Sequence, residues 1–404
     1  MRLTKNEIKK TISSKKYIIS MGIFLILYMA IGFLMCKDTL SSKPENLLNM
    51  NEKSLQYWLK EKSNKGISKE RKFEIEKNIK YIERRNKDLK FEIANKNMNW
   101  NERLKKQNND LRERLKEIKL KGNTGAISEY KDKIATNEYY LNNNIKPTPN
   151  YEITAFSLLP RINMFVGILI ISVIIGIIVS DSVSGEFNPA TIKFLLTKPV
   201  SRSRILFSKF MASILICVFS FIIIKILAFL VLGIGFRFGS WKEPVTFYAK
   251  YVADKDLIAN SGLGVMPDLN SLKTYTMLKM VLLSEGINIL FVSATASVCF
   301  LISTLTKKSS TSISISIILL AIVSFLNTKN LDGSNGSGSV GIHKIMPYLF
   351  STYSSGEFVI TGEITRKIGL QFVNIPFIIF ILLGWTVICY LISNFIFSRR
   401  DILC

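Results

Sequence analysis

The chain has 404 residues and a formal net charge of +24, and yet 48% of its residues are hydrophobic. A soluble protein of this length would normally divide into about two or three domains. Here the apolar residues are gathered into blocks of roughly 17–25 residues, the length that crosses a ~30 Å hydrocarbon core as a helix. This distribution excludes an ordinary soluble protein and predicts an integral membrane protein.

The rare residue types exclude several kinds of chemistry. His343 is the only histidine, and all five cysteines lie in or beside apolar blocks. Catalysis by a histidine pair or triad, a disulfide-stapled outer domain and a metal site therefore have little support. The glycine-rich run 333–341 lacks the lysine of a phosphate-binding loop. We expect no catalytic residue, no metal and no cofactor in this chain, which is predicted not to be an enzyme.

Six apolar blocks predict six transmembrane (TM) helices, with both termini and the Lys- and Arg-rich short loops in the cytoplasm. The first block is too long for a signal peptide and lacks a cleavage site after it. The fifth reaches spanning length only if the polar run Ser309–Ser316 joins it. The predicted segments are a cytoplasmic amphipathic helix (1–16), TM1 (17–36), an extracellular helical domain (37–158), TM2 (159–181), a cytoplasmic coupling loop (182–206), TM3 (207–237), an extracellular loop (238–274), TM4 (275–304), TM5 (305–326), an extracellular loop (327–368), TM6 (369–397) and a cytoplasmic tail (398–404).

The segment 37–158 is predicted to be helical, because Pro and Gly are almost absent between Ser68 and Lys121 and apolar residues recur at coiled-coil spacing. Asn86 and Lys96 interrupt this apolar seam. Both ends must return to the membrane, so we expect an antiparallel hairpin or coiled-coil stalk. Whether 95–101 forms its tip stays open. The intermixed Lys and Glu indicate a solvated surface and no nucleic-acid partner. The predicted fold class is an all-α integral membrane protein with this helical stalk between TM1 and TM2.

The segment from Ser180 to Phe210 carries the strongest functional signal. Pro189 can start a short helix, which Pro199 would end about two turns later, with acidic Glu186 before it and a basic cluster after it. Two interpretations compete. One is a topogenic positive loop with interfacial side chains, and the other is a docking helix for a cytoplasmic partner.

This segment resembles the hallmark of ABC-2-type permeases, the membrane-spanning subunits of bacterial ATP-driven exporters. In that hallmark an acidic residue precedes Gly-Thr, Leu-Leu, Pro-Val-Ser-Arg and Lys. The matching positions are Glu186, Thr191, Leu195, Leu196, Pro199, Val200, Ser201, Arg202 and Lys209. Ala190 stands where the family has Gly. The six spans and the large loop after the first also match, and the resemblance does not cover the helical stalk.

The resemblance implies a permease subunit that couples ATP hydrolysis by a separate subunit to export across the bacterial plasma membrane. A second copy, or a related permease, would pair with it in the bilayer above two ATPase subunits, which would hold ATP and magnesium. The exported substrate could be a peptide, a lipid or a small toxic compound, as in antimicrobial resistance. The residues expected to couple to the ATPase are Glu186, Phe187, Thr191, Ile192, Leu195, Leu196, Pro199, Arg202 and Lys209.

Polar residues inside the predicted spans are a second class of candidates, because such residues are costly in lipid. Lys225 and Glu285 lie at similar depth in neighbouring spans and could form an ion pair. Alternatively, Lys225 reaches the interface and Glu285 is protonated. Interhelical hydrogen bonds are expected for Asn288, Gln371 and Asn374. The stretch Ile345–Phe358 is amphipathic, and it could be a re-entrant or interfacial helix or a simple loop.

Two other functions remain open at the level of sequence. An ABC-type membrane regulator could pass ATP-driven motion to the stalk, or sense a peptide with it, without moving substrate. A secondary transporter would need no ATPase, and it is expected to contain internal repeats with broken helices, which the sequence does not show convincingly.

Overall fold

The computed structural model describes residues 2–63, 68–96, 98–119, 124–149, 151–166, 169–187, 200–254, 258, 264–331 and 344–399. Six helical segments in these ranges are long and apolar enough to cross a membrane, as the sequence predicts. They are formed by α2 (Lys15–Ser41), α8 (Leu169–Val179) with the turn after it, α10 (Arg202–Gly235), α12 (Met277–Leu305), α13 (Ser309–Leu331) and α17 (Ile375–Arg399).

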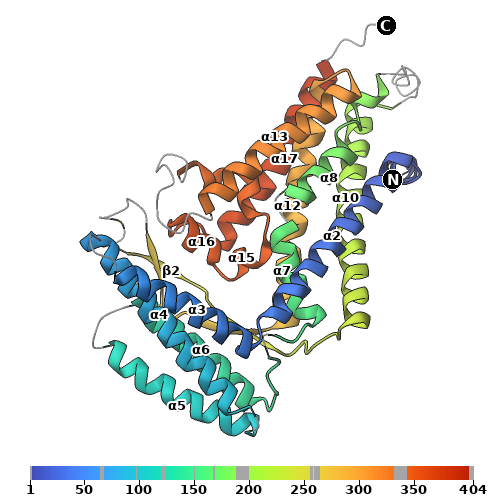
Figure 1. Cartoon of the computed structure of the whole chain (residues 1–404). Coiled ribbons are helices and arrows are strands. Elements are labelled where there is room, and N and C mark those ends of the chain that lie inside the picture. The colour runs from blue at the N-terminus through green and yellow to red at the C-terminus, as the bar shows by residue number, and fades with distance from the viewer. Residues whose placement is uncertain are drawn as a thin grey trace.

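The six segments form one bundle with α12 at its centre (Figure 1). The helix α12 contacts α8, α10, α13 and α17, and most of its surface is buried inside the chain. The second span is preceded by α7 (Ala155–Val166), which contains Pro160 and packs against α2. The fifth span begins at Ser309, so the polar run does join the apolar block.

The two ends of the bundle carry different structures (Figure 1). One end, here called the terminal face, holds α1 (Arg2–Ile12), the single-turn helix η1 (Ser184–Glu186), the start of α10 and the end of α17. The other end carries a helical domain of α3 (Pro44–Lys62), α4 (Lys69–Ala94), α5 (Trp100–Lys119) and α6 (Thr124–Asn142).

The helical domain doubles back as the sequence requires, but it is built from two packed hairpins in place of one projecting stalk. Helix α3 packs along α4, and α5 packs along α6. Arg114 of α5 pairs with Asp88 of α4 at 3.0 Å, which joins the two hairpins. Because α4 ends at Ala94 and α5 begins at Trp100, the boundary between the two helices falls within the Asn-rich run.

Each hairpin contains a hydrogen-bonded pair of asparagines at its seam. Asn86, which interrupts the apolar pattern, is buried and accepts a hydrogen bond from Asn51 Nδ2 at 2.9 Å. Asn108 is also buried and accepts one from Asn137 Nδ2 at 2.8 Å. Any other register would leave these amides unpaired, so the pairs select the alignment of the helices.

The loop between α10 and α12 contains four strands that the all-α prediction missed. β1 (Pro244–Tyr248) pairs antiparallel with β4 (Leu272–Thr276), and β2 (Tyr251–Ala253) pairs antiparallel with β3 (Val265–Pro267). This ribbon packs against α6, where the hydroxyls of Thr246 and Thr136 lie 2.8 Å apart. The strand β4 runs directly into α12, which begins at Met277.

The segment before α17 forms a series of short helices and helical turns instead of one re-entrant helix. These elements are η2 (Met346–Tyr348), η3 (Phe350–Tyr353), α15 (Gly356–Ile360) and α16 (Glu363–Ile368). The turn η3 and helix α15 pack directly on α12. Gly356 is required at this contact, because a Cβ there would overlap the carbonyl oxygen of Ser284.

Candidate functional site

Four charged residues converge at the terminal face and are called the Glu186 cluster: Glu7, Lys10, Glu186 and Lys209. The Glu186 carboxylate lies 2.8 Å from Lys209 Nζ and 2.6 Å from Lys10 Nζ. Lys209 Nζ also pairs with Glu7 at 2.9 Å. Glu186 and Lys209 are each 5% exposed, so the centre of this cluster is almost free of solvent.

The cluster joins three segments that are distant in sequence. Glu7 and Lys10 lie one helical turn apart on α1, which packs along α10. Lys209 lies two turns into α10, and Glu186 ends η1. Burial acts to lower the pKa of Lys10, but the hydrogen bond and the charge of Glu186 outweigh burial and raise it. Lys10 therefore stays a cation through the neutral range.

Two serines fix the turn that presents Glu186. Ser303 Oγ of α12 accepts hydrogen bonds from the backbone N–H groups of Val183 at 3.0 Å and Ser184 at 3.1 Å. Ser312 Oγ of α13 donates to the carbonyl oxygen of Ser180. The turn is thus held by hydrogen bonds from the two spans α12 and α13 and by the ion pairs of the Glu186 cluster.

A cleft of about 220 Å³ lies beside the cluster, between α1, α2, α8 and α10. Its wall includes a second ion pair, in which Lys16 Nζ lies 2.5 Å from Asp181. No histidine or cysteine is among the residues that line the cleft, and its hydroxyl groups are those of Thr11, Ser14, Ser182 and Ser213. The paired charges therefore link α1, α10 and the turn after α8 at one point.

A second charged pair lies inside the bundle. The Lys225 ammonium of α10 is 2.6 and 2.8 Å from the two oxygens of the Glu285 carboxylate of α12. Lys225 is 5% exposed and also stacks over the Phe221 ring at 4.1 Å. Lys225 and Glu285 therefore form the ion pair between neighbouring spans, and the Lys225 side chain does not extend to the membrane interface.

Asn288 extends this pair toward α15. Its Nδ2 lies 3.4 Å from Glu285, and its Oδ1 accepts a hydrogen bond from the Gly356 N–H at 2.9 Å. Asn288 is buried at 4% exposure. A chain of polar contacts therefore runs from α10 through α12 to the short helix before the last span.

Comparison with known proteins agrees with this architecture. The profile of the ABC-2 family transporter protein family matches residues 1–402. The chain belongs to this family. It is also similar to "Uncharacterized protein YhcI" of Bacillus subtilis (strain 168), with 27% identity over 317 residues that cover 77% of this chain and 87% of the relative. As a member of the ABC-2 family with six spanning segments, it is a protein of the plasma membrane.

The structure of this ABC-2 family protein places only part of the predicted coupling set. Glu186 and Lys209 meet in the cluster, and Phe187 is partly buried against the core of the bundle. Arg202 is exposed at the first turn of α10. The rest of the predicted coupling residues lie outside the described residues: Thr191, Ile192, Leu195, Leu196 and Pro199. His343 also lies outside them.

Two of the predicted intramembrane polar residues lie before the last span. Gln371 and Asn374 precede α17, and both are exposed. Asn374 Oδ1 accepts a hydrogen bond from the Phe377 N–H at 3.0 Å, so it caps the helix. Asn374 was expected to form an interhelical hydrogen bond, but it caps α17 instead. The reason is that the last span begins at Ile375, later than the apolar pattern of the sequence indicates.

Sequence reasoning missed Glu7, Lys10 and Ser303 as partners of the turn that contains Glu186. Glu7 and Lys10 are three residues apart on an amphipathic helix, so their side chains lie on the same face. This spacing was the signal in the sequence that could have identified them. Nothing in the sequence marks Ser303, since serines are common in α12. Among the described residues, no group of three or more His, Cys, Asp or Glu could hold a metal ion.

Proposed function

We propose that this ABC-2 family protein is the membrane-spanning permease subunit of an ATP-driven exporter. Two copies of a separate ATPase would bind ATP and magnesium, and a second permease copy or a related permease would complete the assembly in the bilayer. The family membership supports this assignment. The observation that carries it is the Glu186 cluster, which ties the start of the predicted docking segment to two helices.

The terminal face is proposed to lie in the cytoplasm. Lysines and arginines of the N-terminal helix, the start of α10 and the end of α17 gather there, as positive-inside orientation requires. The helical domain and the β-ribbon would then lie outside the cell. Long segments cross largely regardless of their charge, so the lysine-rich domain does not oppose this orientation.

In this proposal the segment 186–197 fits a groove on the ATPase and moves when the ATPase pair closes on ATP. The displacement would reach α10 through Lys209, α1 through Lys10 and α12 through the hydrogen bonds of Ser303. Because packed helices shift between discrete arrangements, such a displacement would favour an inward or an outward state of the bundle. The Lys225–Glu285 pair would keep α10 and α12 moving together.

The test is purification of the tagged full-length chain from its native membrane. An ATPase subunit should co-purify with the wild type, and the complex in vesicles should move substrate only with ATP. Glu186→Gln should leave ATPase binding in place and reduce ATP-driven transport at least tenfold. Failure of the wild type to recover any ATPase contradicts the proposal, and ATP hydrolysis without substrate movement contradicts export.

A further inference from the structure

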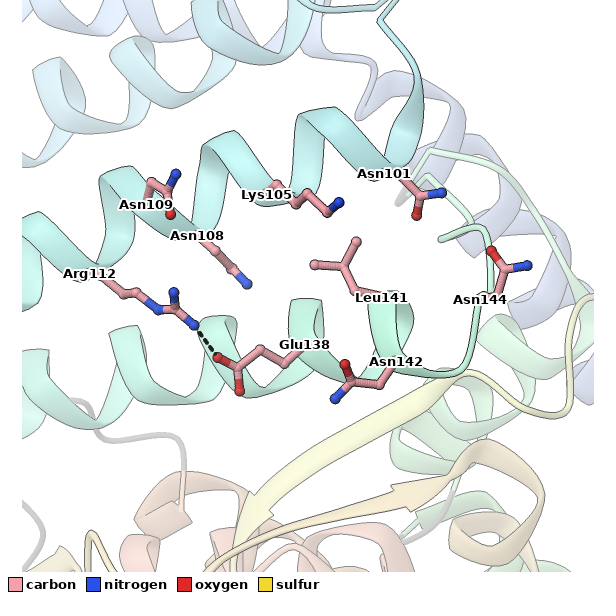
Figure 2. Close-up of a pocket in the computed structure, with 9 residues that line it drawn as sticks. All are labelled: Asn101, Lys105, Asn108, Asn109, Arg112, Glu138, Leu141, Asn142 and Asn144. Atoms are coloured by element: carbon pink, nitrogen blue, oxygen red, sulfur yellow. Dashed lines mark hydrogen bonds and ion pairs between the residues drawn. The ribbon is translucent and has the colours of Figure 1, made fainter.

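A cleft of about 570 Å³ opens between α5 and α6, and is called the α5–α6 cleft. Its volume lies in the range of small-ligand sites, roughly 300–1,000 Å³. Figure 2 shows Asn108 and Arg112 of α5 and Glu138 and Leu141 of α6 in the space between the two helices. The lining residues are Asn101, Lys105, Asn108, Asn109, Arg112, Glu138, Leu141, Asn142 and Asn144.

Some of these side chains hold the walls of the cleft in place. Asn108 is buried at 3% exposure and accepts the hydrogen bond of Asn137. Arg112 donates to Glu138 across the cleft at 2.7 Å (Figure 2). The shape of the cleft is therefore fixed by polar contacts between α5 and α6, which lowers the ordering cost of binding.

Other polar side chains line the cleft and have hydrogen-bonding groups that are not used within the chain. Among the residues that the structure describes, the side chains of Lys105, Asn109 and Asn142 have no hydrogen-bond or ion-pair partner. An asparagine amide offers both donors and an acceptor, so it can pair with a peptide group at two points. The lysine ammonium is suited to a carboxylate.

The lining also favours one class of ligand over another. Leu141 provides an apolar surface in the middle of the cleft (Figure 2). None of the nine lining residues is aromatic, so the cleft offers no ring on which the face of a sugar could stack. Amides, one unpaired cation and one aliphatic side chain match a peptide better than a glycan.

We propose that the α5–α6 cleft binds a short peptide with a free C-terminal carboxylate. The peptide groups pair with the asparagine amides, and the carboxylate pairs with Lys105. The site lies at the opposite end of the molecule from the Glu186 cluster (Figure 1), and its occupancy does not require that this chain export anything.

Occupancy of the cleft has a direct route to the membrane. Helix α6 supplies Glu138 and Leu141 to the cleft, and its Thr136 contacts Thr246 of β1. Strand β1 pairs along its full length with β4, which continues into α12 without a linker. A ligand that shifts the α5–α6 pair as a unit therefore displaces the start of the central span.

The test measures fluorescence anisotropy with the full-length chain in detergent. The probes are a library of fluorescein-labelled pentapeptides with a free carboxylate, the same library as C-terminal amides, and chitooligosaccharides. A subset of the free acids should bind saturably. Lys105→Gln should weaken that binding about tenfold, the effect of losing one charge-assisted hydrogen bond, and should leave binding of the amides unchanged. Asn109→Leu should weaken binding of both libraries.

The matched control is Lys116→Gln, which removes the same charge from the same helix outside the cleft and should bind like the wild type. All variants are compared at equal helix content and elution volume, so unfolding does not imitate loss of the site. The proposal is overturned if no pentapeptide binds saturably, if Lys105→Gln and Lys116→Gln bind equally well, or if Asn109→Leu abolishes binding of an oligosaccharide alone.

Discussion

The Glu186 cluster and the ion pairs of the helical domain are made from the same residue types in different surroundings. The side chains of Glu186 and Lys209 are 6% and 5% exposed, and their charged groups lie 2.8 Å apart. In the domain, Lys96 and Glu45 lie 3.3 Å apart, with side chains 65% and 51% exposed. The separations are similar, so burial is the main difference between the two pairs.

Burial changes what each pair contributes. An exposed ion pair contributes only about 0–1 kcal/mol to the stability of the protein, because water screens both charges. Removing one partner of a buried pair costs about 3–5 kcal/mol, because the other charge is left without solvent or counter-ion. The domain can therefore lose a surface pair with little effect, whereas the cluster cannot lose Glu186 without a structural response.

The largest effect is expected for Glu186→Gln. The variant leaves Lys209 buried with only Glu7, so we expect a loss of about 3 kcal/mol in stability, measured by thermal unfolding in nanodiscs. Glu45→Gln removes one partner of an exposed pair in the domain and should leave the unfolding midpoint close to that of the wild type. Equal midpoints for the two variants would remove the distinction between the regions.

A second test applies the same reasoning inside the bundle. Glu285→Gln should destabilise the protein by about 2–3 kcal/mol, because Lys225 then lies buried with no counter-ion. The double variant Lys225→Met with Glu285→Leu should recover most of that loss, since apolar residues can replace a buried pair at little cost. If the double variant unfolds at the same temperature as Glu285→Gln, the pair stabilises the protein by more than the mutual neutralisation of its two charges.

The smallest effect concerns a buried carboxyl at the contact between α6 and the β-ribbon. Burial raises the pKa of Asp132, and the hydrogen bond to Thr246 opposes this only partly. Asp132 Oδ1 is also buried without a hydrogen-bond partner in the part of the chain that the structure describes. The protonated form is therefore favoured by folding, and this contribution is present below the unfolded pKa, near 3.9, and is lost as pH rises through the folded pKa.

Asp132→Asn should accordingly raise stability at neutral pH by about 1 kcal/mol. It should also flatten the rise in the unfolding midpoint between neutral and mildly acidic pH. Burial also raises the pKa of Glu92, Glu243 and Glu357, and these carboxyls contribute to the remaining slope. The control is Asp110→Asn, which replaces a half-exposed carboxylate that pairs with Arg114. A variant whose midpoint keeps the full pH dependence of the wild type would rule out Asp132 as its source.

The sequence predicted those parts of the fold that depend on length and periodicity. Apolar length marks the six spans, and the seam of Ile75, Ile79 and Ile82 marks a buried helix face. The four strands were missed, although Val245 and Phe247 alternate with polar Thr246. A run of five residues between two long spans gives a weak signal, and the partner strand lies more than 20 residues away.

The candidate site was predictable to the extent that it is local in sequence. The order Glu186 to Lys209 marked the coupling loop, but it could not show that both residues bind the N-terminal helix. That contact depends on how α1 packs along α10, which no spacing encodes. Pairing of Lys225 with Glu285 was open for the same reason, because equal depth does not fix the rotation of two helices about their axes.

The central position of α12 restricts how this chain can meet a second copy of itself. Within its apolar window 72% of α12 is buried inside the chain, against 22% for α2, 22% for α13 and 17% for α17. A second copy would therefore have little access to α12 and would dock on the more exposed spans, which are these three helices and α10, 39% of whose window is buried. Substitutions on those outer faces will report on assembly in the bilayer, whereas substitutions in α12 will report on the integrity of the single subunit.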